Sequence, residues 1–323
     1  MKIAWITTIC CLTLLMGCKP GSTNQPTGDS PEVKSSEPAA TRSFIDASGE
    51  IVTIPTAPKR IIVLSEVDLD VCLALGVQPV GTINGRGQNS PPNYLQDKRD
   101  GITIIGDFPK PNVDKVIALK PDLILVGGYV DAGILRMLKK ISPVCMTWNM
   151  GDNWPAALKT IGSILNLEAE AEAVLASYNE AVIQAKASLP HIQGKTASIV
   201  RWNPKGPAYM YQDSFAATVL HDLGFARPEH QSEKGMGHGP PLSFEALDRI
   251  DADWIFLGTL SPAGEAADAM KAALDMPAFK QLKAVKSNQM IVVDGSLWTS
   301  LAGPIGARYI IDRILQTTQP APQ

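Results

Sequence analysis

Cationic and aromatic side chains follow several apolar segments of the chain, at positions where strands are predicted to end. A guanidinium group offers several fixed hydrogen-bond donors to oxygen anions, and aromatic rings supply apolar walls that stack on cations. The carboxyl ends of parallel strands meet at one edge of a sheet, so these side chains should gather in one cleft. The pattern predicts a binding site for an oxygen-rich anionic ligand, with the candidate residues Arg86, Tyr129, Trp148, Arg201, Trp202, Tyr211 and Trp298.

Arg201 is the strongest candidate among these residues. It ends the apolar run 197–200, where a charge at a simple core position would be costly. It therefore contacts a ligand or forms an ion pair between two parts of the fold. Arg86 lies in the turn-rich stretch 84–89, so a plain exposed loop position is an alternative for it.

The aromatic candidates have an alternative role in packing, because buried aromatic rings are the usual case. Trp202 and Trp298 fit a core or rim position as well as a ligand wall. Tyr209 and Tyr211 are two residues apart on an extended stretch and should share one face, where a role as an apolar wall is favoured over a role as metal ligands.

A repeated segment indicates the elements that position these residues. Residues 112–127 read as a helix capped by Asn112, with Asp114 in its first turn, followed by a buried strand at 123–126. Val116, Ile117 and Leu119 are expected to face inward. The same pattern returns at 243–258, where Glu245 matches Asp114, and a repeat of this length predicts two lobes of similar build.

The predicted fold class is α/β, with two lobes that each have a central, mainly parallel sheet flanked by helices. One long connecting helix, residues 168–189, should join the lobes, and at about 1.5 Å per residue it would measure about 30 Å. Its apolar stripe comprises Ala171, Val174, Leu175, Tyr178, Val182 and Ile183. The predicted boundaries are 43–152 for the N-terminal lobe, 153–190 for the connecting helices and 191–316 for the C-terminal lobe.

The N-terminus reads as an export segment rather than a part of the fold. Residues 1–18 hold a short apolar stretch that closes on Leu-Met-Gly-Cys and resembles the bacterial lipobox, in which Cys18 becomes lipid-modified. An ordinary cleaved signal peptide is the alternative. Residues 19–42 should form a solvated tether and residues 317–323 a disordered tail. Cys72 and Cys145 are expected to be buried free thiols, although a disulfide between them is conceivable.

From about Arg42 to Leu315 the chain resembles the periplasmic-binding-protein family that delivers ferric siderophores, haem and cobalamin to ABC importers. The resemblance depends on Pro-Lys-Arg-Ile-Ile-Val-Leu at 58–64, Leu-Ala-Leu-Gly-Val-Gln-Pro-Val-Gly at 73–81, Leu-Lys-Pro-Asp-Leu-Ile at 119–124 and the long central helix. It implies a monomeric, lipid-anchored protein at the periplasm or extracytoplasmic face, which captures an iron(III)-siderophore complex and carries it to a permease with its ATPase. It also implies that Asp114 and Glu245 meet arginines of the permease; otherwise both only complement helix dipoles.

Other functions have less support in the sequence. The net charge of −3 gives no case for nucleic-acid binding. No GxSxG, HExxH or phosphate-cradling glycine motif indicates an enzyme, and Asp68 and Asp70 read as helix caps. The four histidines are scattered, so neither a bare metal-ion site nor a protein-bound cofactor is predicted. Haem or cobalamin remains the alternative ligand, with His238 or Tyr211 as a haem ligand.

Overall fold

The computed structural model describes residues 40–235 and 237–318. The predicted signal segment, Cys18, the tether up to residue 39 and the tail beyond residue 318 lie outside these residues. The first strand already begins at Thr41, so the prediction that the tether extends to residue 42 is wrong at its last two positions. Arg42 is fixed because its Nη2 donates to the carbonyl oxygens of Ser163 and Ile164, at 2.5 and 3.0 Å.

The N-terminal lobe is built on a six-stranded sheet that is parallel except for its edge strand β6. The strand order is β6-β5-β4-β3-β7-β8. The strands are β3 (Ile61–Val63), β4 (Gly81–Asn84), β5 (Thr103–Asp107), β6 (Lys110–Pro111), β7 (Leu123–Gly127) and β8 (Val144–Trp148). A separate antiparallel hairpin, β1 (Thr41–Ile45) and β2 (Ile51–Pro55), precedes it.

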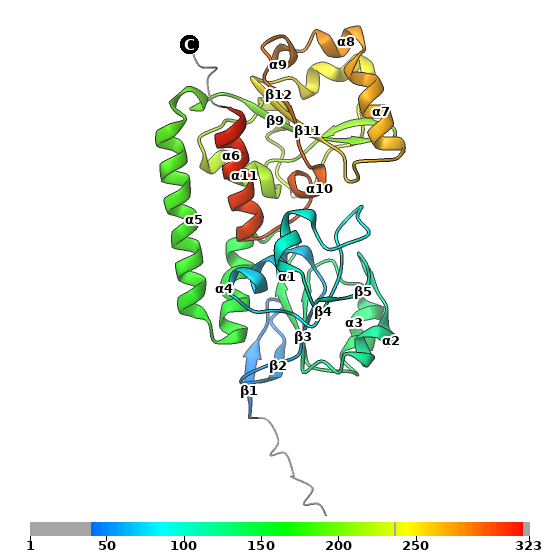
Figure 1. Cartoon of the computed structure of the whole chain (residues 1–323), viewed down its shortest axis with the longest axis vertical. Coiled ribbons are helices and arrows are strands. Elements are labelled where there is room, and N and C mark those ends of the chain that lie inside the picture. The colour runs from blue at the N-terminus through cyan, green and yellow to red at the C-terminus, as the bar shows by residue number, and fades with distance from the viewer. Residues whose placement is uncertain (1–39, 236, 319–323) are drawn as a thin grey trace, which may run out of the picture. The chain divides into compact units, whose positions relative to one another are not determined.

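Helices cover this sheet on both faces (Figure 1). They are α1 (Glu66–Ala74), the 3₁₀ helix η1 (Asn93–Lys98), α2 (Val113–Ala118), α3 (Ala132–Leu138) and α4 (Trp154–Leu165). All five residues of β7 are buried, as its unbroken apolar run predicts. Cys72 and Cys145 are buried free thiols, which agrees with the expectation from their apolar surroundings.

The C-terminal lobe has a four-stranded sheet in the order β10-β9-β11-β12. Its strands are β9 (Ala197–Asn203), β10 (Gly206–Tyr209), β11 (Trp254–Gly258) and β12 (Met290–Val292). The helices are η2 (Pro190–Ile192), α6 (Phe215–Asp222), η3 (Glu229–Gln231), η4 (Phe244–Ile250), α7 (Glu265–Leu274), α8 (Pro277–Lys280), α9 (Lys283–Lys286), α10 (Gly295–Trp298) and α11 (Pro304–Thr317). Strands β9, β11 and β12 are parallel, and only β10 runs against its neighbour.

The two copies of the repeat pair with their neighbours in the same register. Leu123 of β7 lies opposite Ile61 of β3, and Trp254 of β11 lies opposite Ala197 of β9. The matched aspartates also have the same role. Asp122 accepts the backbone N–H groups of Lys59 and Arg60 just before β3, at 2.7 and 2.8 Å.

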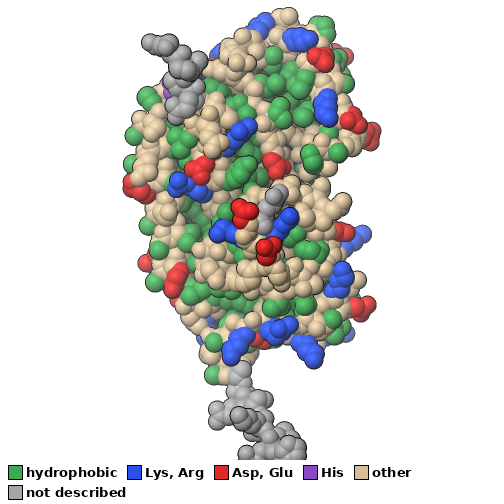
Figure 2. Space-filling model, viewed as in Figure 1, with side chains coloured by type: hydrophobic (Ala, Val, Ile, Leu, Met, Phe, Trp, Pro, Cys, Tyr) green, Lys and Arg blue, Asp and Glu red, His purple; other side chains and the backbone are tan. Residues whose placement is uncertain are grey.

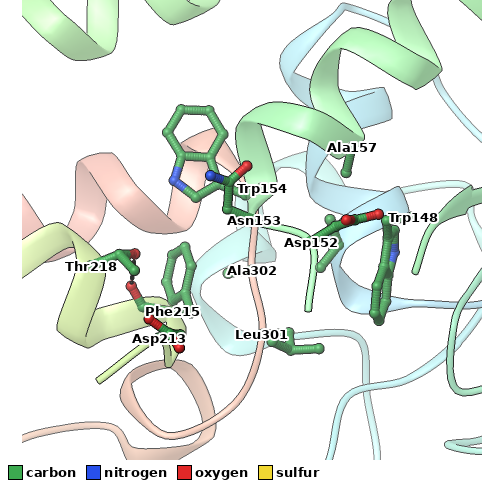
Figure 3. A pocket seen from close by; sticks show the side chains of 11 residues that line it. Trp148, Asp152, Asn153, Trp154, Ala157, Asp213, Phe215, Thr218, Leu301 and Ala302 are labelled. Carbon is green, nitrogen blue, oxygen red and sulfur yellow. Dashed lines mark hydrogen bonds between the residues drawn. The ribbon is translucent and has the colours of Figure 1, made fainter. Parts of the chain in front are cut away.

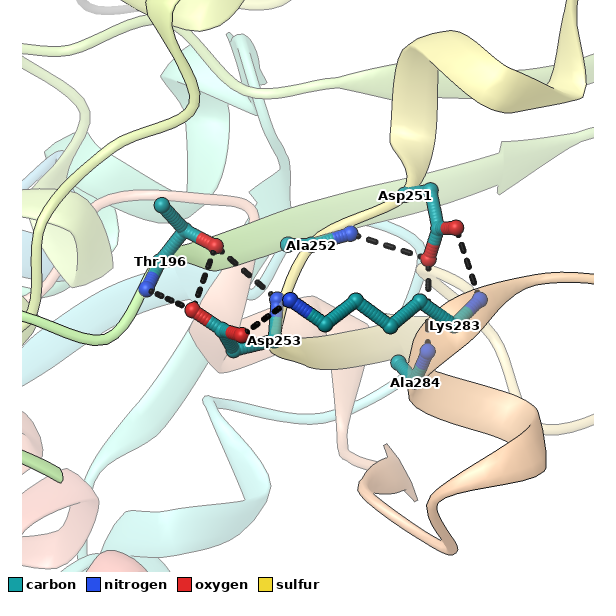
Figure 4. Close-up of polar contacts among 6 residues, drawn as sticks. All are labelled: Thr196, Asp251, Ala252, Asp253, Lys283 and Ala284. Atoms are coloured by element: carbon teal, nitrogen blue, oxygen red, sulfur yellow. Dashed lines mark hydrogen bonds and ion pairs between the residues drawn. The ribbon is translucent and has the colours of Figure 1, made fainter. Parts of the chain in front are cut away.

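Asp253 fixes the start of β9 in the equivalent way (Figure 4). Its Oδ2 accepts the backbone N–H and the hydroxyl of Thr196, at 2.8 and 3.0 Å, and Lys283 donates to its Oδ1. Charge-assisted bonds to a backbone at the end of a strand fix the register of the parallel pair. The duplication predicted from the sequence is therefore visible in the hydrogen bonding.

The helices of the two copies differ more than the strands do. Asn112 caps α2 by accepting the N–H of Lys115 at 3.0 Å, whereas Ser243 makes no such bond and is followed by the kinked 3₁₀ helix η4. Within α2 only Val116 is buried. The prediction for Ile117 is wrong, because its side chain is 52% exposed on the outer face of a one-and-a-half-turn helix.

The long helix α5 (Glu168–Ser188) connects the lobes, as predicted. It runs beside α4 and α11 in Figure 1 and packs on both. Ala171, Tyr178, Ala181 and Ala185 are its buried residues, whereas Ile183 is 62% exposed and does not belong to the packed stripe. Within the described residues no helix is long and apolar enough to cross a membrane.

Candidate functional site

Arg86 lies partly buried beside the aromatic residues of the N-terminal lobe. Its Cζ is 4.1 Å from the ring centroid of Phe108 and 4.9 Å from that of Tyr129, so both rings are within cation–π distance. The loop that carries it is closed by a backbone bond from Gly85 to Ser90 at 2.9 Å, and by Gly87 in the left-handed region (φ +68°). Arg86 is therefore a positioned residue and not a freely exposed loop arginine.

Arg201 projects from β9 of the C-terminal lobe and is fixed by Thr299. Its Nε donates to the hydroxyl of Thr299 at 2.9 Å, and its Nη2 donates to the carbonyl oxygen of the same residue. Burial and, to a smaller extent, the charge of Arg86 together lower the pKa of Arg201 to about 10, against the opposing charge of Glu66. Two arginines from different lobes thus lie close enough for their charges to interact. Among the described residues, Arg201 has no carboxylate within 4 Å.

Glu66, at the start of α1, is the acidic residue of this group. Its Oε1 accepts the backbone N–H of Arg86 at 2.7 Å, and its Oε2 lies 3.7 Å from the Nε of Arg86. Burial raises the pKa of Glu66, while the charges of Arg86 and Arg201 and the backbone hydrogen bond lower it. The site therefore combines two guanidinium groups with one buried carboxyl group.

The aromatic side of the site is a row of three rings at the ends of β5, β7 and β8. Tyr129 packs edge-on against Phe108, with ring centroids 6.2 Å apart, and edge-on against Trp148 at 5.5 Å. Tyr129 thus lies beside Arg86. Trp148 packs behind Tyr129 and is only 2% exposed, so it supports the aromatic row and offers little surface of its own to a ligand.

The other aromatic candidates lie elsewhere. Trp202 is 1% exposed and packs against Phe279 in the core of the C-terminal lobe, because neighbouring residues of a strand point to opposite faces and Arg201 takes the other one. Trp298 is also 1% exposed and stacks on Phe256, with centroids 4.8 Å apart. Neither indole offers a surface to a ligand, so the packing alternative replaces both ligand predictions.

Tyr211 follows the edge strand β10 and packs edge-on against Tyr209, with centroids 6.3 Å apart. The expectation that these two rings share a face is met. No contact of Tyr211 with either cleft arginine is present among the described residues, however, and Tyr209 is buried with its hydroxyl accepting a bond from Arg249 at 3.0 Å.

A small pocket lies between the lobes beside Trp148 (Figure 3). Trp148 and Asp152 line it from the N-terminal lobe, and Asp213, Phe215 and Thr218 line it from the C-terminal lobe. It contains neither arginine. The space between the lobes is therefore polar and cationic around Arg86 and Arg201, and mainly apolar around this pocket.

Three residues of the site escaped the sequence interpretation: Glu66, Phe108 and Thr299. Phe108 directly follows β5, a short strand containing a glycine that the chain pattern did not reveal. Glu66 follows β3 after only Leu64 and Ser65, so its position near a strand end was a usable signal. Asp68 and Asp70 were read as caps, but both are fully buried and Ser65 is the N-cap of α1, so that interpretation is wrong.

The described residues contain no group of three or more histidine, cysteine or acidic side chains placed to hold a metal ion. Acidic and basic side chains are interspersed over the face seen in Figure 2, with apolar ones between them. The paired arginines and the aromatic row are thus a local feature of the space between the lobes.

Two α/β lobes joined by one long helix, with charged and aromatic side chains between them, define a two-lobed binding protein. The sequence profile described as periplasmic binding protein matches residues 61–297, and the chain belongs to this family. The family consists of substrate-binding proteins.

The chain is 33% identical over 291 residues to the Bacillus subtilis protein named probable siderophore-binding lipoprotein YfiY, covering 88% of each chain. It is 31% identical over 251 residues to the iron(3+)-hydroxamate-binding protein FhuD of the same organism, covering 75% of this chain and 76% of FhuD. The crystal structure of Staphylococcus aureus SirA complexed with staphyloferrin B matches with a TM-score of 0.75 and 26% identity, covering 86% of this chain and 98% of SirA.

Proposed function

We propose that the protein captures a ferric siderophore between its two lobes and delivers it to the permease of an ABC importer. The names of YfiY, FhuD and the SirA complex refer to siderophores or iron(III) hydroxamates, which supports this ligand class over haem and cobalamin. The protein binds its ligand without chemical turnover and acts as a monomer.

The observation that carries the proposal is the approach of Arg86 and Arg201 from opposite lobes. A ferric siderophore presents a metal already wrapped in oxygen ligands, and guanidinium groups bind such oxygens with several donors each. The Nε of Arg86 faces Glu66 at 3.7 Å, but the side chain is 21% exposed, so its terminal guanidinium nitrogens are the donors offered to the ligand. Phe108 and Tyr129 supply an apolar wall on the same side.

The remaining parts of the proposal concern delivery. Cys18 carries the lipid that anchors the protein at the extracytoplasmic side of the membrane. Residues 19–40 are the tether between this anchor and the lobes. Asp114 and Glu245 are both exposed, at the starts of α2 and η4, and contact the permease. The lobes correspond to 41–152 and 191–317, with 153–190 between them, because β1 begins at Thr41 and α11 ends at Thr317.

Tryptophan-fluorescence titration tests the ligand class. The purified protein is titrated with ferric catecholate, hydroxamate and citrate-type siderophores, with haem, with cobalamin and with the iron-free siderophores. Submicromolar binding of at least one ferric siderophore, well above that of its iron-free form, is expected. Tight binding of haem with a Soret band, or of cobalamin alone, would instead favour the alternative ligands.

A further inference from the structure

The buried carboxyl group of Glu66 is an unusual neighbour for an anion-binding arginine pair. The residue is 5% exposed and lies on the first turn of α1, directly against Arg86. Any anionic ligand that binds Arg86 and Arg201 must therefore share them with a carboxylate that the protein already provides. Like charges in a site of low dielectric destabilise each other strongly.

The groups that face Glu66 from other elements are few in the described part of the chain. They are Arg86 on the loop after β4, Arg201 on β9 and Tyr94 on η1. Burial and nearby acids raise the pKa of Tyr94, so it stays a neutral phenol. Asp70, one turn further along α1, accepts the N–H groups of Ile305 and Gly306, both at 2.9 Å, and is satisfied by them.

We propose that Glu66 determines the charge selectivity of the cleft, and that a strongly anionic ferric complex binds only with uptake of one proton by Glu66. This inference rests on the proposed function. The carboxylate cancels one of the two guanidinium charges in the empty site. The remaining positive charge is sufficient for a neutral or weakly anionic complex. A trianionic complex, such as a ferric tris-catecholate, engages both guanidinium groups and leaves Glu66 as an uncompensated buried charge.

Protonation of Glu66 removes that charge and keeps the local geometry. The proton comes from solvent and adds to one carboxylate oxygen, while the other oxygen still accepts the backbone N–H of Arg86. Affinity for the trianionic complex should then rise as pH falls, by up to about tenfold per pH unit for one proton. Affinity for a neutral complex should change little.

The experiment compares the wild type with Glu66→Gln, which keeps an acceptor oxygen but cannot ionise. Isothermal titration calorimetry measures the binding of a neutral ferric trihydroxamate and of a trianionic ferric tris-catecholate. Titrations at several pH values between about 6 and 8, in buffers of different ionisation enthalpy, give the affinity and the number of protons taken up. We expect the wild type to take up about one proton with the trianionic complex only. At the higher pH, Glu66→Gln should bind that complex with an affinity at least about tenfold higher than that of the wild type, and without proton uptake.

Glu50→Gln is the matched control, because Glu50 is an exposed residue of the hairpin whose carboxylate pairs with Lys139. It should behave as the wild type. Binding of the trianionic complex to the wild type without proton uptake would overturn the inference, even if Glu66→Gln did not fold. The inference would also be overturned if neither the wild type nor Glu66→Gln bound the trianionic complex while both bound the neutral complex. If no ferric complex binds the wild type, the proposed function itself fails.

Discussion

The two cleft arginines are held in different ways, and this sets what each can contribute. The guanidinium plane of Arg201 is fixed by two bonds to Thr299, so its orientation is prepared before a ligand arrives. Arg86 is positioned by ring contacts, by its backbone bond to Glu66 and by the approach of its Nε to the carboxylate of Glu66 at 3.7 Å. Arg201 thus provides a guanidinium fixed by a neutral partner, and Arg86 a guanidinium whose charge is shared with Glu66.

Replacing Arg201 with alanine should weaken ferric siderophore binding by roughly ten- to a hundredfold. Hydrogen bonds to a charged group contribute about 1.5–3 kcal/mol each, and the lost guanidinium also leaves ligand charge unpaired. Fluorescence titration measures the change. Arg308→Ala is the control, since Arg308 forms an exposed ion pair with Asp312 one turn along α11. Equal affinity of Arg201→Ala and the wild type would contradict the ligand role of Arg201.

Asp68 should make the stability of the ligand-free protein depend on pH. Burial raises its folded-state pKa from 3.8 to about 6, although Thr147 donates to it at 2.5 Å and other hydrogen bonds lower the value. A group with a raised folded-state pKa contributes stability that is fully present below its unfolded value, near 4, and is lost as pH rises through about 6.

Asp68→Asn therefore gains stability relative to the wild type between about pH 4 and 7, by a few kcal/mol at most. Thermal unfolding of both proteins across this range measures the difference. The control is Asp97→Asn, because Asp97 is an exposed residue of η1 and its replacement should change the stability of the protein little. A constant difference for Asp68→Asn would mean that Asp68 titrates alike in the folded and unfolded states.

At the scale of the elements, the sequence was informative wherever burial follows from a continuous apolar run. Strands β7 and β11 and the long helix α5 lie where they were predicted. The strand β5 and the helix α7 were missed: Thr103–Asp107 is short and includes a glycine, and the buried residues of Glu265–Leu274 are mainly alanines, Ala267 and Ala273 beside Met270. An apolar pattern identifies an element only if enough of its residues must be buried.

The direction of single side chains was harder to predict than the elements that carry them. The sequence places Arg201 and Trp202 together at the end of β9, but only one of two neighbours can face the cleft. Which face is covered depends on α8 and η4, whose packing against Trp202 arises far along the chain. Glu66 could be located at a strand end, but its burial depends on the same kind of distant contact.

The stability of the protein should respond differently to loss of the residue at the helix start in the two copies of the repeat. Asn112→Ala should destabilise the protein by about 1 kcal/mol, because the side chain of Asn112 satisfies the N–H of Lys115. Ser243→Ala should cost less, since Ser243 makes no capping bond to the backbone of η4. Urea unfolding measures both values. A larger loss for Ser243→Ala would show that the two segments are capped alike in solution.

At the scale of the whole binding unit, α5 and α11 link the two sheets with stiff elements rather than extended strands. Asp70 on α1 also accepts the backbone N–H groups of Ile305 and Gly306 at the start of α11. In addition, Gly87 in the N-terminal lobe lies so close to Leu260 in the C-terminal lobe that an added Cβ would come within 2.8 Å of it. These contacts favour small movements of the lobes on ligand binding, so the exposed surfaces at α2 and η4 should keep nearly constant spacing.

That rigidity makes the pair Asp114 and Glu245 suitable for recognition by a symmetric permease. A hydrogen bond from Ser243 lowers the pKa of Glu245, so its carboxylate is charged near neutral pH. If the pair meets permease arginines, the double variant Asp114→Lys, Glu245→Lys replaces attraction with repulsion. Uptake of iron-loaded siderophore by cells should then fall by about tenfold or more, because like-charge contacts at an interface cost several kcal/mol.

Ligand affinity of the purified double variant should be unchanged, because both residues lie outside the cleft. The matched control reverses two other exposed acids on the same lobes, Asp131→Lys and Glu265→Lys, which also start helices but are not equivalent by the repeat. Normal uptake by the docking variant, with normal folding and ligand binding, would leave Asp114 and Glu245 only a favourable interaction with their helix dipoles, of about 0.3–1 kcal/mol each. A similar loss of uptake in both double variants would instead indicate that total charge, and not these two positions, governs recognition.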